Sequence, residues 1–210
     1  LHPTIARDLN LARHGLDLKA QRISTRSLLS GGRSFDAADA ASFAAINRAD
    51  GESYPAVMAR LTRMADALAG YALHTPPRPD IAKMDWQGKL NLGKFAWAMR
   101  RLGRKDMLEL SRILTMNVND LANDYFENEA VRALLCFEGV LGLCRGPRSP
   151  STVFNLLYRL SSLATNGQGG FLLPTGGMGS ITHALAKAAV AAGATIRTSA
   201  PVDHILIEND

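Results

Sequence analysis

Apolar residues recur every three or four positions through much of this chain, which is the spacing of one face of an α-helix. The clearest run starts after Pro55 and steps through Val57, Leu61, Met64 and Leu68. The same spacing predicts further helices over residues 86–102, 105–115, 118–126, 151–164 and 180–192. Residues 129–143 are apolar nearly all round, so we expect a helix there that is buried on every side.

Polar residues and glycine mark where these helices begin and end. We expect Asp36 to cap an alanine-rich helix that runs to residue 47, and Ser151 to cap the helix over 151–164. Ser53 or Tyr54 would open the next helix with Pro55 in its first turn. Gly193 follows the last helix, where glycine commonly ends one. The segment TPPRPD at residues 75–80 is read as a linker.

Short strand-like segments lie near both ends of the chain. Residues 16–20 and 26–29 precede the turn sequence SGGR, and residues 195–197 and 202–207 follow the last helix. The fold class is therefore α+β and helix-dominated. The final strand stops at half of a hairpin turn and the chain starts at leucine, so we expect an interior piece of a longer protein.

Composition excludes several classes of protein. The chain is 47% hydrophobic and 20% charged, which does not fit low-complexity disorder, and its two cysteines do not fit a disulfide scaffold. We find no secretory signal and no run of ~20 apolar residues, so we expect no stable membrane span. A cytoplasmic, reducing location is the expectation. The net charge of +5 permits an acidic partner without requiring one.

Candidate reactive residues are few. The five histidines show no metal-binding spacing, so we expect no metal site. Cys136 and Cys144 lie eight residues apart on one predicted helix, at roughly 12 Å, and are interpreted as buried free thiols. Glu138 lies within an apolar run. It is either a functional carboxyl with a raised pKa or a structural carboxylate that pairs with an arginine or faces solvent, and we favour the structural interpretation.

A basic cluster occupies Arg100, Arg101, Arg104 and Lys105. It could contact phosphates, but we favour a solvated helix end, where cations are stabilised by the helix dipole. No aromatic residues are expected to interleave with it as a stacking platform. We therefore expect no nucleic-acid partner.

The glycine-rich stretch over residues 166–179 is the most informative feature. It precedes a helix, whose N-terminus is able to face an anion. It fits equally well a tight loop in which two layers of backbone approach closely. The residues alone leave both interpretations open.

Several segments together resemble one family. Residues 174–185 read PTGGMGSITHAL, followed by AGATIR at 192–197 and APVDHI at 200–205, with RDLNLARHGL at 7–16 and GPRSP at 146–150 upstream. They resemble the phytoene desaturase-like FAD-dependent oxidoreductases, most of all the phytoene dehydrogenase-related branch akin to the pyridine nucleotide-disulfide oxidoreductase domain proteins. The resemblance implies an inserted helical substrate domain over residues 1–165, with a short N-terminal strand region. Residues 166–210 would be a returning piece of a Rossmann-like FAD-binding domain.

The resemblance also implies roles for particular residues. Val202 would meet the adenine edge of FAD through its backbone, and Gly176 and Gly177 would shape the turn beside the cofactor. The implied substrate-lining residues are Gln168, Gly169, Phe171 and Met178. No residue is assigned as catalytic.

The implied activity is flavin hydride transfer, or isomerisation, on an apolar, polyene-like or isoprenoid-like small molecule. The family's GxGxxG fingerprint is absent from these 210 residues, so we expect this chain alone to bind FAD weakly or not at all and to show no turnover. The alternatives are a non-catalytic helical lipid- or protein-binding module and, least favoured, a basic nucleic-acid binder. The oligomeric state is left open.

Overall fold

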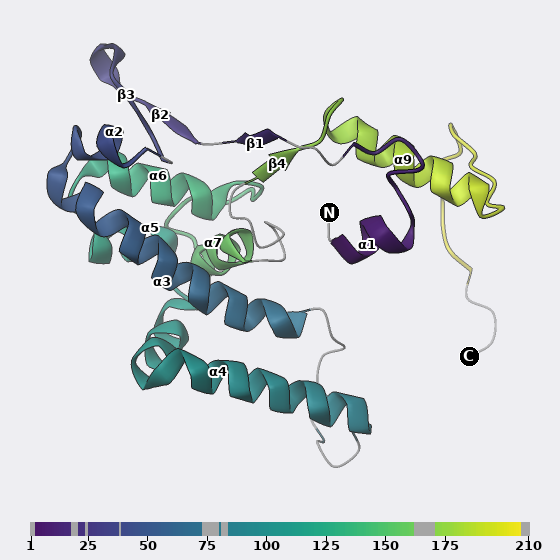
Figure 1. The fold of residues 1–210 in the computed structure, drawn as a ribbon, viewed down its shortest axis with the longest axis horizontal. Helices are drawn as coiled ribbons and strands as arrows, with labels where there is room; N and C mark the ends of the chain where they lie inside the picture. Colours follow the sequence, from purple (N-terminus) through teal and green to yellow (C-terminus); the bar gives the residue numbers. More distant parts are fainter. Residues whose placement is uncertain are drawn as a thin grey trace. The chain divides into compact units, whose positions relative to one another are not determined.

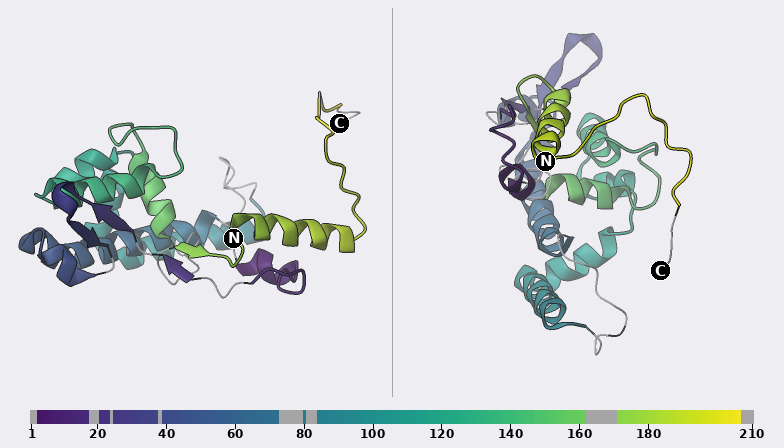
Figure 2. Two further views of the ribbon diagram at one scale, coloured as in Figure 1. Left: turned by 90° about the horizontal axis from the view of Figure 1, so that it is seen from above. Right: turned by 90° about the vertical axis from the view of Figure 1, so that its right-hand side faces the viewer.

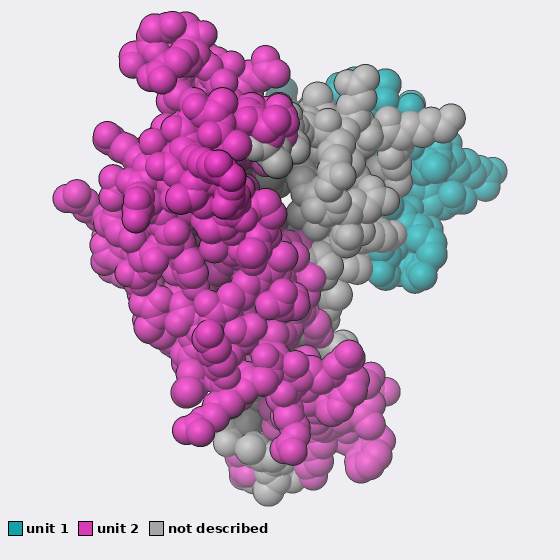
Figure 3. Space-filling view, turned by 60° about the vertical axis from the view of Figure 1, so that its left-hand side comes forward, with its two compact units in different colours: residues 1–21, 173–210 teal, residues 22–172 magenta. Residues whose placement is uncertain are grey.

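The computed structural model describes the chain except for residues 1–2, 18–20, 24, 38, 73–79, 81–83, 162–170 and 207–210. Its residues form two compact units: unit 1 comprises residues 1–21 and 173–210, and unit 2 comprises residues 22–172 (Figure 3). The chain passes between the units within β1 (Gln21–Ile23) and again within β4 (Phe171–Leu173), and these two strands pair. Residues 1–21 thus group with the C-terminal segment. The assignment of 1–165 and 166–210 to a substrate and an FAD-binding domain stays a prediction.

Unit 2 begins with a short hairpin. Strands β2 (Arg26–Leu28) and β3 (Ser34–Asp36) run antiparallel, with Arg26 opposite Asp36. The turn between them, η1 (Ser30–Gly32), holds Gly31 at a φ of 74°, which residues with a side chain rarely adopt. The strand and turn predicted for residues 26–33 are therefore confirmed.

The short helix α2 (Ala40–Ala44) begins later than predicted. Its N-cap is Asp39, whose carboxylate accepts the N–H of Ala41 at 3.0 Å. The prediction that Asp36 caps a helix reaching residue 47 was wrong. Pairing with β2 keeps Asp36 extended, and its N–H donates to the hydroxyl of Ser42 at 2.9 Å.

The long helix α3 (Arg48–Ala72) starts five residues before the predicted Ser53. The side-chain oxygen of Asn47 accepts the N–H of Asp50 at 3.0 Å and stabilises this earlier first turn. Pro55 consequently lies inside the helix and not in its first turn, so the prediction for this helix start was wrong.

Helix α4 (Trp86–Ile113) packs against α3, and the two run antiparallel (Figures 1 and 2). It begins as predicted at Trp86, with the Asp85 carboxylate accepting the N–H of Gly88 at 2.9 Å. At Gly103 the backbone leaves the helical conformation, with φ 78° and ψ 162°. This glycine is the break between the helices predicted over 86–102 and 105–115, which are confirmed as the two parts of α4.

Three shorter helices complete unit 2: α5 (Val118–Tyr125), α6 (Glu129–Val140) and α7 (Thr152–Leu160). Asn117 and Asn128 cap α5 and α6 through their side-chain oxygens. Ser151 is the N-cap residue of α7, as predicted, but it has a φ of 63° and its side chain makes no capping hydrogen bond. Its neighbour Thr152 bonds instead, accepting the N–H of Val118 at 2.8 Å. Helix α7 ends at Leu160, and residues 162–164 of the predicted helix lie outside the described residues.

A single core joins these elements of unit 2. Its aromatic part is a chain of rings from Phe35 through Phe43 and Tyr54 to Phe126, with successive ring centres 4.4 to 5.6 Å apart. Burial, with the nearby charge of Glu138, raises the pKa of the Tyr54 hydroxyl far above its ordinary value. The fully buried residues around these rings include Leu61, Met64, Ile113, Val118, Leu121, Val131, Leu135, Val153, Leu156 and Leu157.

Helix α6 is not buried on every side, which corrects the sequence prediction. Leu134 and Leu135 face the core, whereas Phe137 is 46% exposed. Both cysteines are free, as predicted, but Cys136 is only half-buried and Cys144 is exposed. A helix packed against neighbours on one side keeps its other side outside, however apolar its sequence.

Unit 1 has a much smaller core. Helices α1 (Pro3–Asp8) and α9 (Met178–Ala191) belong to it, and the buried residues of its hydrophobic cluster are Leu11, Leu16 and Ala184. Gly193, at a φ of 94°, ends α9 as predicted. The strand predicted over 195–197 was wrong, because these residues are irregular. Of the strand predicted over 202–207, residues 202–206 are also irregular, with Ile205 83% exposed, and residue 207 lies outside the description. A strand needs a hydrogen-bonded neighbour, and the described residues provide none there. Of the strand predicted over 16–20, residues 16–17 are irregular and 18–20 lie outside the description.

Candidate functional site

The glycine turn that leads into α9 is the first candidate site. The N–H of Gly177 donates to the carbonyl of Pro174 at 2.9 Å, and the N–H of Ser180 donates to the carbonyl of Gly177 at 3.1 Å. Gly176 and Gly177 have φ values of 85° and 73°, so this turn requires glycine for its backbone conformation. The hydroxyl of Thr175 donates a hydrogen bond to the carboxylate of Asp17 at 3.1 Å, which holds the turn in place.

The turn is open on its outer side. Among the described residues, a Cβ placed on Gly177 or Gly179 would meet no atom within 4 Å, and one on Gly176 would meet only the Ser180 Cβ, at 3.6 Å. The described part of the chain therefore leaves space beside these three glycines. Residues 166–170 of the glycine-rich stretch lie outside the description, so both interpretations of the stretch stay predictions.

The predicted site residues are only partly brought together. Gly176, Gly177 and Met178 are consecutive at the start of α9, and the Met178 side chain is 67% exposed. Phe171 lies in β4 just before the turn. Val202 is 80% exposed in the segment that leaves the opposite end of α9. Gln168 and Gly169 lie outside the described residues. The proposed role of each of these residues stays a prediction.

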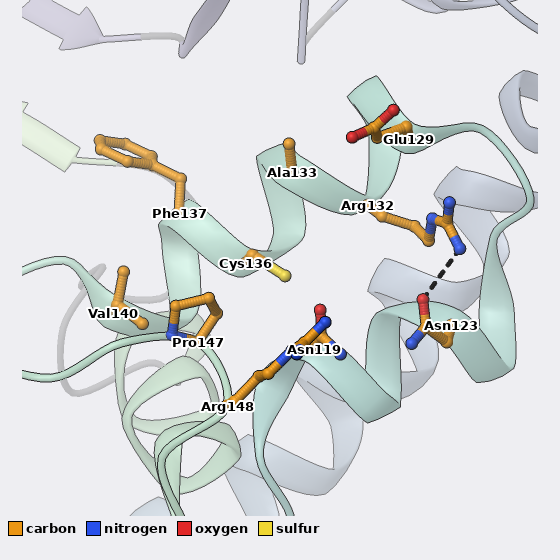
Figure 4. Close-up of a pocket in the computed structure, with 10 residues that line it drawn as sticks. All are labelled: Asn119, Asn123, Glu129, Arg132, Ala133, Cys136, Phe137, Val140, Pro147 and Arg148. Carbon is orange, nitrogen blue, oxygen red and sulfur yellow. Dashed lines mark hydrogen bonds between the residues drawn. The ribbon is translucent and has the colours of Figure 1, made fainter.

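A second candidate is a groove of about 620 Å³ in unit 2, between α5, α6 and the segment that follows α6 (Figure 4). Polar groups line part of it: Arg132 donates to the Asn123 side-chain oxygen at 2.9 Å, and the N–H of Asn119 donates to the carbonyl of Pro147 at 3.1 Å. The rest of the lining is formed by Glu129, Ala133, Cys136, Phe137, Val140 and Pro147. Sequence reasoning missed this groove because it treated α6 as wholly buried. The available signal was the i, i+4 spacing of Arg132, Cys136 and Val140 on one helix face.

The groove offers charge but no activated nucleophile. Burial raises the pKa of the Cys136 thiol, and the positive charge of Arg132 offsets only part of that effect. The thiol therefore stays protonated at neutral pH and is a poor nucleophile. The guanidinium groups of Arg132 and Arg148 suit an anion more than they suit covalent chemistry.

Glu138 is a paired structural carboxylate, as we favoured from the sequence. Arg159 donates to it at 2.7 Å, and the hydroxyl of Thr25 donates to its other oxygen at 2.9 Å. These bonds join α6 to α7 and to the residue before β2.

A larger polar network ties α4 to α3 and α5. Arg60 donates to Asp106 at 2.8 Å, and this bond, together with the positive charges of Arg60 and Arg63, holds the pKa of the Asp106 carboxyl below its ordinary value. Arg112 bonds Glu109 at 2.7 Å and lowers the pKa of Glu109 in the same way. The network is internally paired, so its role is structural.

The basic cluster of α4 lies at the surface. Arg100, Arg101, Arg104 and Lys105 are exposed around the break at Gly103, as expected for a solvated helix end. One aromatic side chain lies beside the cluster, because the Arg101 guanidinium is 4.6 Å from the centre of the Trp97 ring, at i, i+4 spacing. A single ring covered by an arginine is not a platform of stacked aromatic residues, so the expectation of no nucleic-acid partner stays a prediction.

Two searches of the described residues were negative. No cluster of three or more histidine, cysteine or acidic residues there is placed to hold a metal ion. No helix among them is both long enough and apolar enough to cross a bilayer.

Comparison with known proteins identifies the family to which the chain belongs. It is 26% identical over 236 residues to the pyridine nucleotide-disulfide oxidoreductase domain-containing protein 2 of Rattus norvegicus, and 25% identical to that of Mus musculus. Both alignments cover 100% of this chain but only 39% of the relative. No solved structure matches the chain. The model of the flavin containing amine oxidoreductases matches residues 4–210, which is nearly the whole chain, and the chain belongs to that family.

Proposed function

We propose that this chain is part of an FAD-dependent oxidoreductase that acts on an apolar small molecule by flavin hydride chemistry, as phytoene dehydrogenases do. The observation that carries the proposal is the family match over residues 4–210, which implies a flavin and a redox reaction. The choice of FAD and of an apolar substrate rests on the resemblance of residues 174–185 and 200–205 to the phytoene desaturase-like enzymes.

The glycine turn fits a contact with the cofactor. Its outer side is open, it stands at the N-terminus of a helix of 14 residues, and its backbone requires glycine at 176 and 177. Backbone N–H groups at a helix start favour the negative charge of a group such as phosphate. When bound, the flavin supplies the electron-accepting chemistry, and the chain supplies position and a dry environment.

The remaining residues have proposed roles around that turn. Val202 would hold the adenine edge through its backbone. Phe171 and Met178, with Gln168 and Gly169, would line the cavity for the apolar substrate. A cytoplasmic location and the absence of a nucleic-acid partner also remain proposals.

Flavin content tests the proposal. The protein is purified from its coding sequence together with any flanking coding DNA, and the flavin released on denaturation is identified by chromatography. We expect FAD. A Gly177→Ala variant should retain less of it, because the φ of 73° strains alanine, whereas the matched variant Gly179→Ala changes an equally open position that is already helical. Protein that is purified folded but free of flavin, and that takes up none, contradicts the proposal.

A second experiment tests the substrate class. Reduction of the bound flavin is followed by loss of its visible absorption after mixing with a polyene, and separately with a primary amine. The proposal expects the polyene to react. Reaction with the amine alone would keep the family but contradict the substrate class.

The alternative is a non-catalytic helical module that binds lipid or protein. The observation that favours it is the exposure of two tryptophans on α4, at 76% and 60%. Flavin-free protein that still binds a partner through α4 would support this alternative.

A further inference from the structure

The first part of α4 exposes a stripe of large apolar side chains. Trp86 is 76% exposed, Leu90 45% and Trp97 60%. Their spacing of four and then seven residues places them on one side of the helix. A patch of exposed apolar side chains commonly marks a site that binds another protein or a membrane.

The other side of the same helix is used by the fold. Met99 and Leu102 pack against the core of unit 2, and the second part of α4 buries Leu110 and Ile113. The stripe therefore cannot turn inward without removing these residues from the core. It is a permanent outer face of unit 2.

Positive charge borders the stripe on both sides. Successive residues of an α-helix are turned by about 100° around the helix axis. Measured from Trp86, Lys94 and Arg101 lie within about 80° on one side of the stripe. Lys89 and Arg100 lie within about 60° on the other side. All four are exposed. Residues 86–105 include six lysines and arginines and no acidic residue. None of the six forms an ion pair with a carboxylate among the described residues.

We propose that this face, Trp86–Leu90–Trp97 with its bordering lysines and arginines, binds the surface of an anionic lipid bilayer. The tryptophans and Leu90 would enter the boundary between headgroups and acyl chains, where indole is favoured. The cations would reach upward to headgroup phosphates and carboxylates along their aliphatic stems. The helix would lie in the plane of the surface and would not span the bilayer.

The arrangement favours lipid over nucleic acid. In a nucleic-acid complex the phosphates meet the cations, but the central apolar stripe would face a hydrated, charged backbone. A bilayer offers anionic groups and an apolar layer at the two depths that this face requires. The inference goes beyond the proposed function and does not depend on flavin binding.

The chain carries its own probe for the test. Its two tryptophans both lie on the proposed face, so tryptophan emission reports on that face alone. The full chain is mixed with phosphatidylcholine vesicles that contain about one-third phosphatidylserine, and binding is measured by flotation. We expect binding, a shift of the emission to shorter wavelength, and release at high salt. Pure phosphatidylcholine vesicles should bind far less.

Matched variants distinguish binding through this face from binding through positive charge elsewhere on the protein. Arg100→Gln with Arg101→Gln removes two bordering charges and should weaken partitioning about 30-fold, at about 1 kcal/mol for each charge. Arg145→Gln with Arg197→Gln removes two other exposed arginines and should change partitioning less than about twofold. Trp97→Ser should weaken it about tenfold or more. Because all these side chains are exposed or half-exposed, circular dichroism should show unchanged folding.

Three outcomes would overturn the inference. One is no binding to the anionic vesicles. Another is an equal loss in both arginine pairs, which would indicate unspecific attraction. The third is a different partner for this face. It would be indicated by tryptophan emission that does not shift when the protein binds vesicles, or by tighter binding to duplex DNA than to vesicles.

Discussion

Units 1 and 2 differ greatly in the size of the hydrophobic core that stabilises them. In the described part of unit 2, six helices and a hairpin pack around one continuous core, which includes Phe35 and Leu157. The hydrophobic cluster of unit 1 contains three buried residues among those described, Leu11, Leu16 and Ala184, and residues 194–206 are exposed and irregular. A helix satisfies its own backbone and needs only one covered face, whereas a strand depends on a neighbour. We therefore expect the folding free energy to be concentrated in unit 2.

The largest expected effect is a core truncation in unit 2. Leu121 is 0% exposed, and its replacement by alanine leaves a cavity between helices that cannot collapse fully. Leu121→Ala should lower the free energy of unfolding by about 3 kcal/mol, measured by urea titration.

The counterpart in unit 1 is Leu11→Ala, because Leu11 is also 0% exposed. We expect faster hydrogen exchange in α9 with little change in the main unfolding transition. If Leu11→Ala shifts that transition as much as Leu121→Ala, then the two units unfold together and the comparison fails.

The next effect concerns a buried carboxylate in unit 2. Asp50 is 3% exposed and accepts the N–H groups of Glu127 and Asn128, at 3.1 and 2.7 Å, ahead of α6. Asp50→Ala should cost about 2 kcal/mol, because it leaves two partly buried donors without a partner. Thr175→Val, which removes the exposed bond to Asp17 in unit 1, should cost less than about 0.5 kcal/mol. Similar thermal shifts for the two variants would contradict this order.

These contrasts also explain how much the sequence could predict. The helical elements of unit 2 follow from periodicity. The separate helices predicted over 86–102 and 105–115 match the two parts of α4 on either side of Gly103, and a structural role for Glu138, either paired with an arginine or facing solvent, was favoured over a functional one. The start of α3 and the cap of α2 were missed, since they depend on bonds from Asn47 and on the strand pairing of Asp36. The strands after α9 were predicted from β-branched residues alone, which do not provide a partner. The groove beside α6 was missed because a single sequence does not say which side of an apolar helix is covered.

A third test compares two glycines within helices of unit 2. A Cβ on Gly139 of α6 would lie 2.7 to 2.9 Å from three side-chain atoms of Val118, so α5 and α6 approach closely there. Gly139→Ala should destabilise the protein by about 1–2 kcal/mol through overpacking. A Cβ on Gly70 of α3 would meet no atom of the described residues within 4 Å, so Gly70→Ala should stabilise the protein by about 0.5 kcal/mol or more. Chemical denaturation measures both, and the same sign for both would contradict the close packing of α5 on α6.

The smallest effect is a dependence of stability on pH that belongs to unit 2. The hydrogen bond from Arg60 lowers the pKa of Asp106 in the folded state below its ordinary value of 3.8. A carboxyl with a lowered folded pKa contributes its stability in full above the ordinary value, and loses it as the pH falls through the folded pKa. Unfolding free energy should therefore decrease below about pH 4, and Asp106→Asn should cost about 1 kcal/mol at neutral pH and reduce that slope.

The control for this last prediction lies in unit 1. Its ion pairs among the described residues, Arg7 with Asp8 and Asp203 with His204, are exposed and next to each other in sequence. Asp8→Asn should therefore leave the acid slope unchanged, since such pairs contribute little to folding. A slope that responds to Asp8→Asn and not to Asp106→Asn would move the acid-sensitive part of the fold from unit 2 to unit 1. The contrast between a paired network and isolated surface pairs would then be reversed.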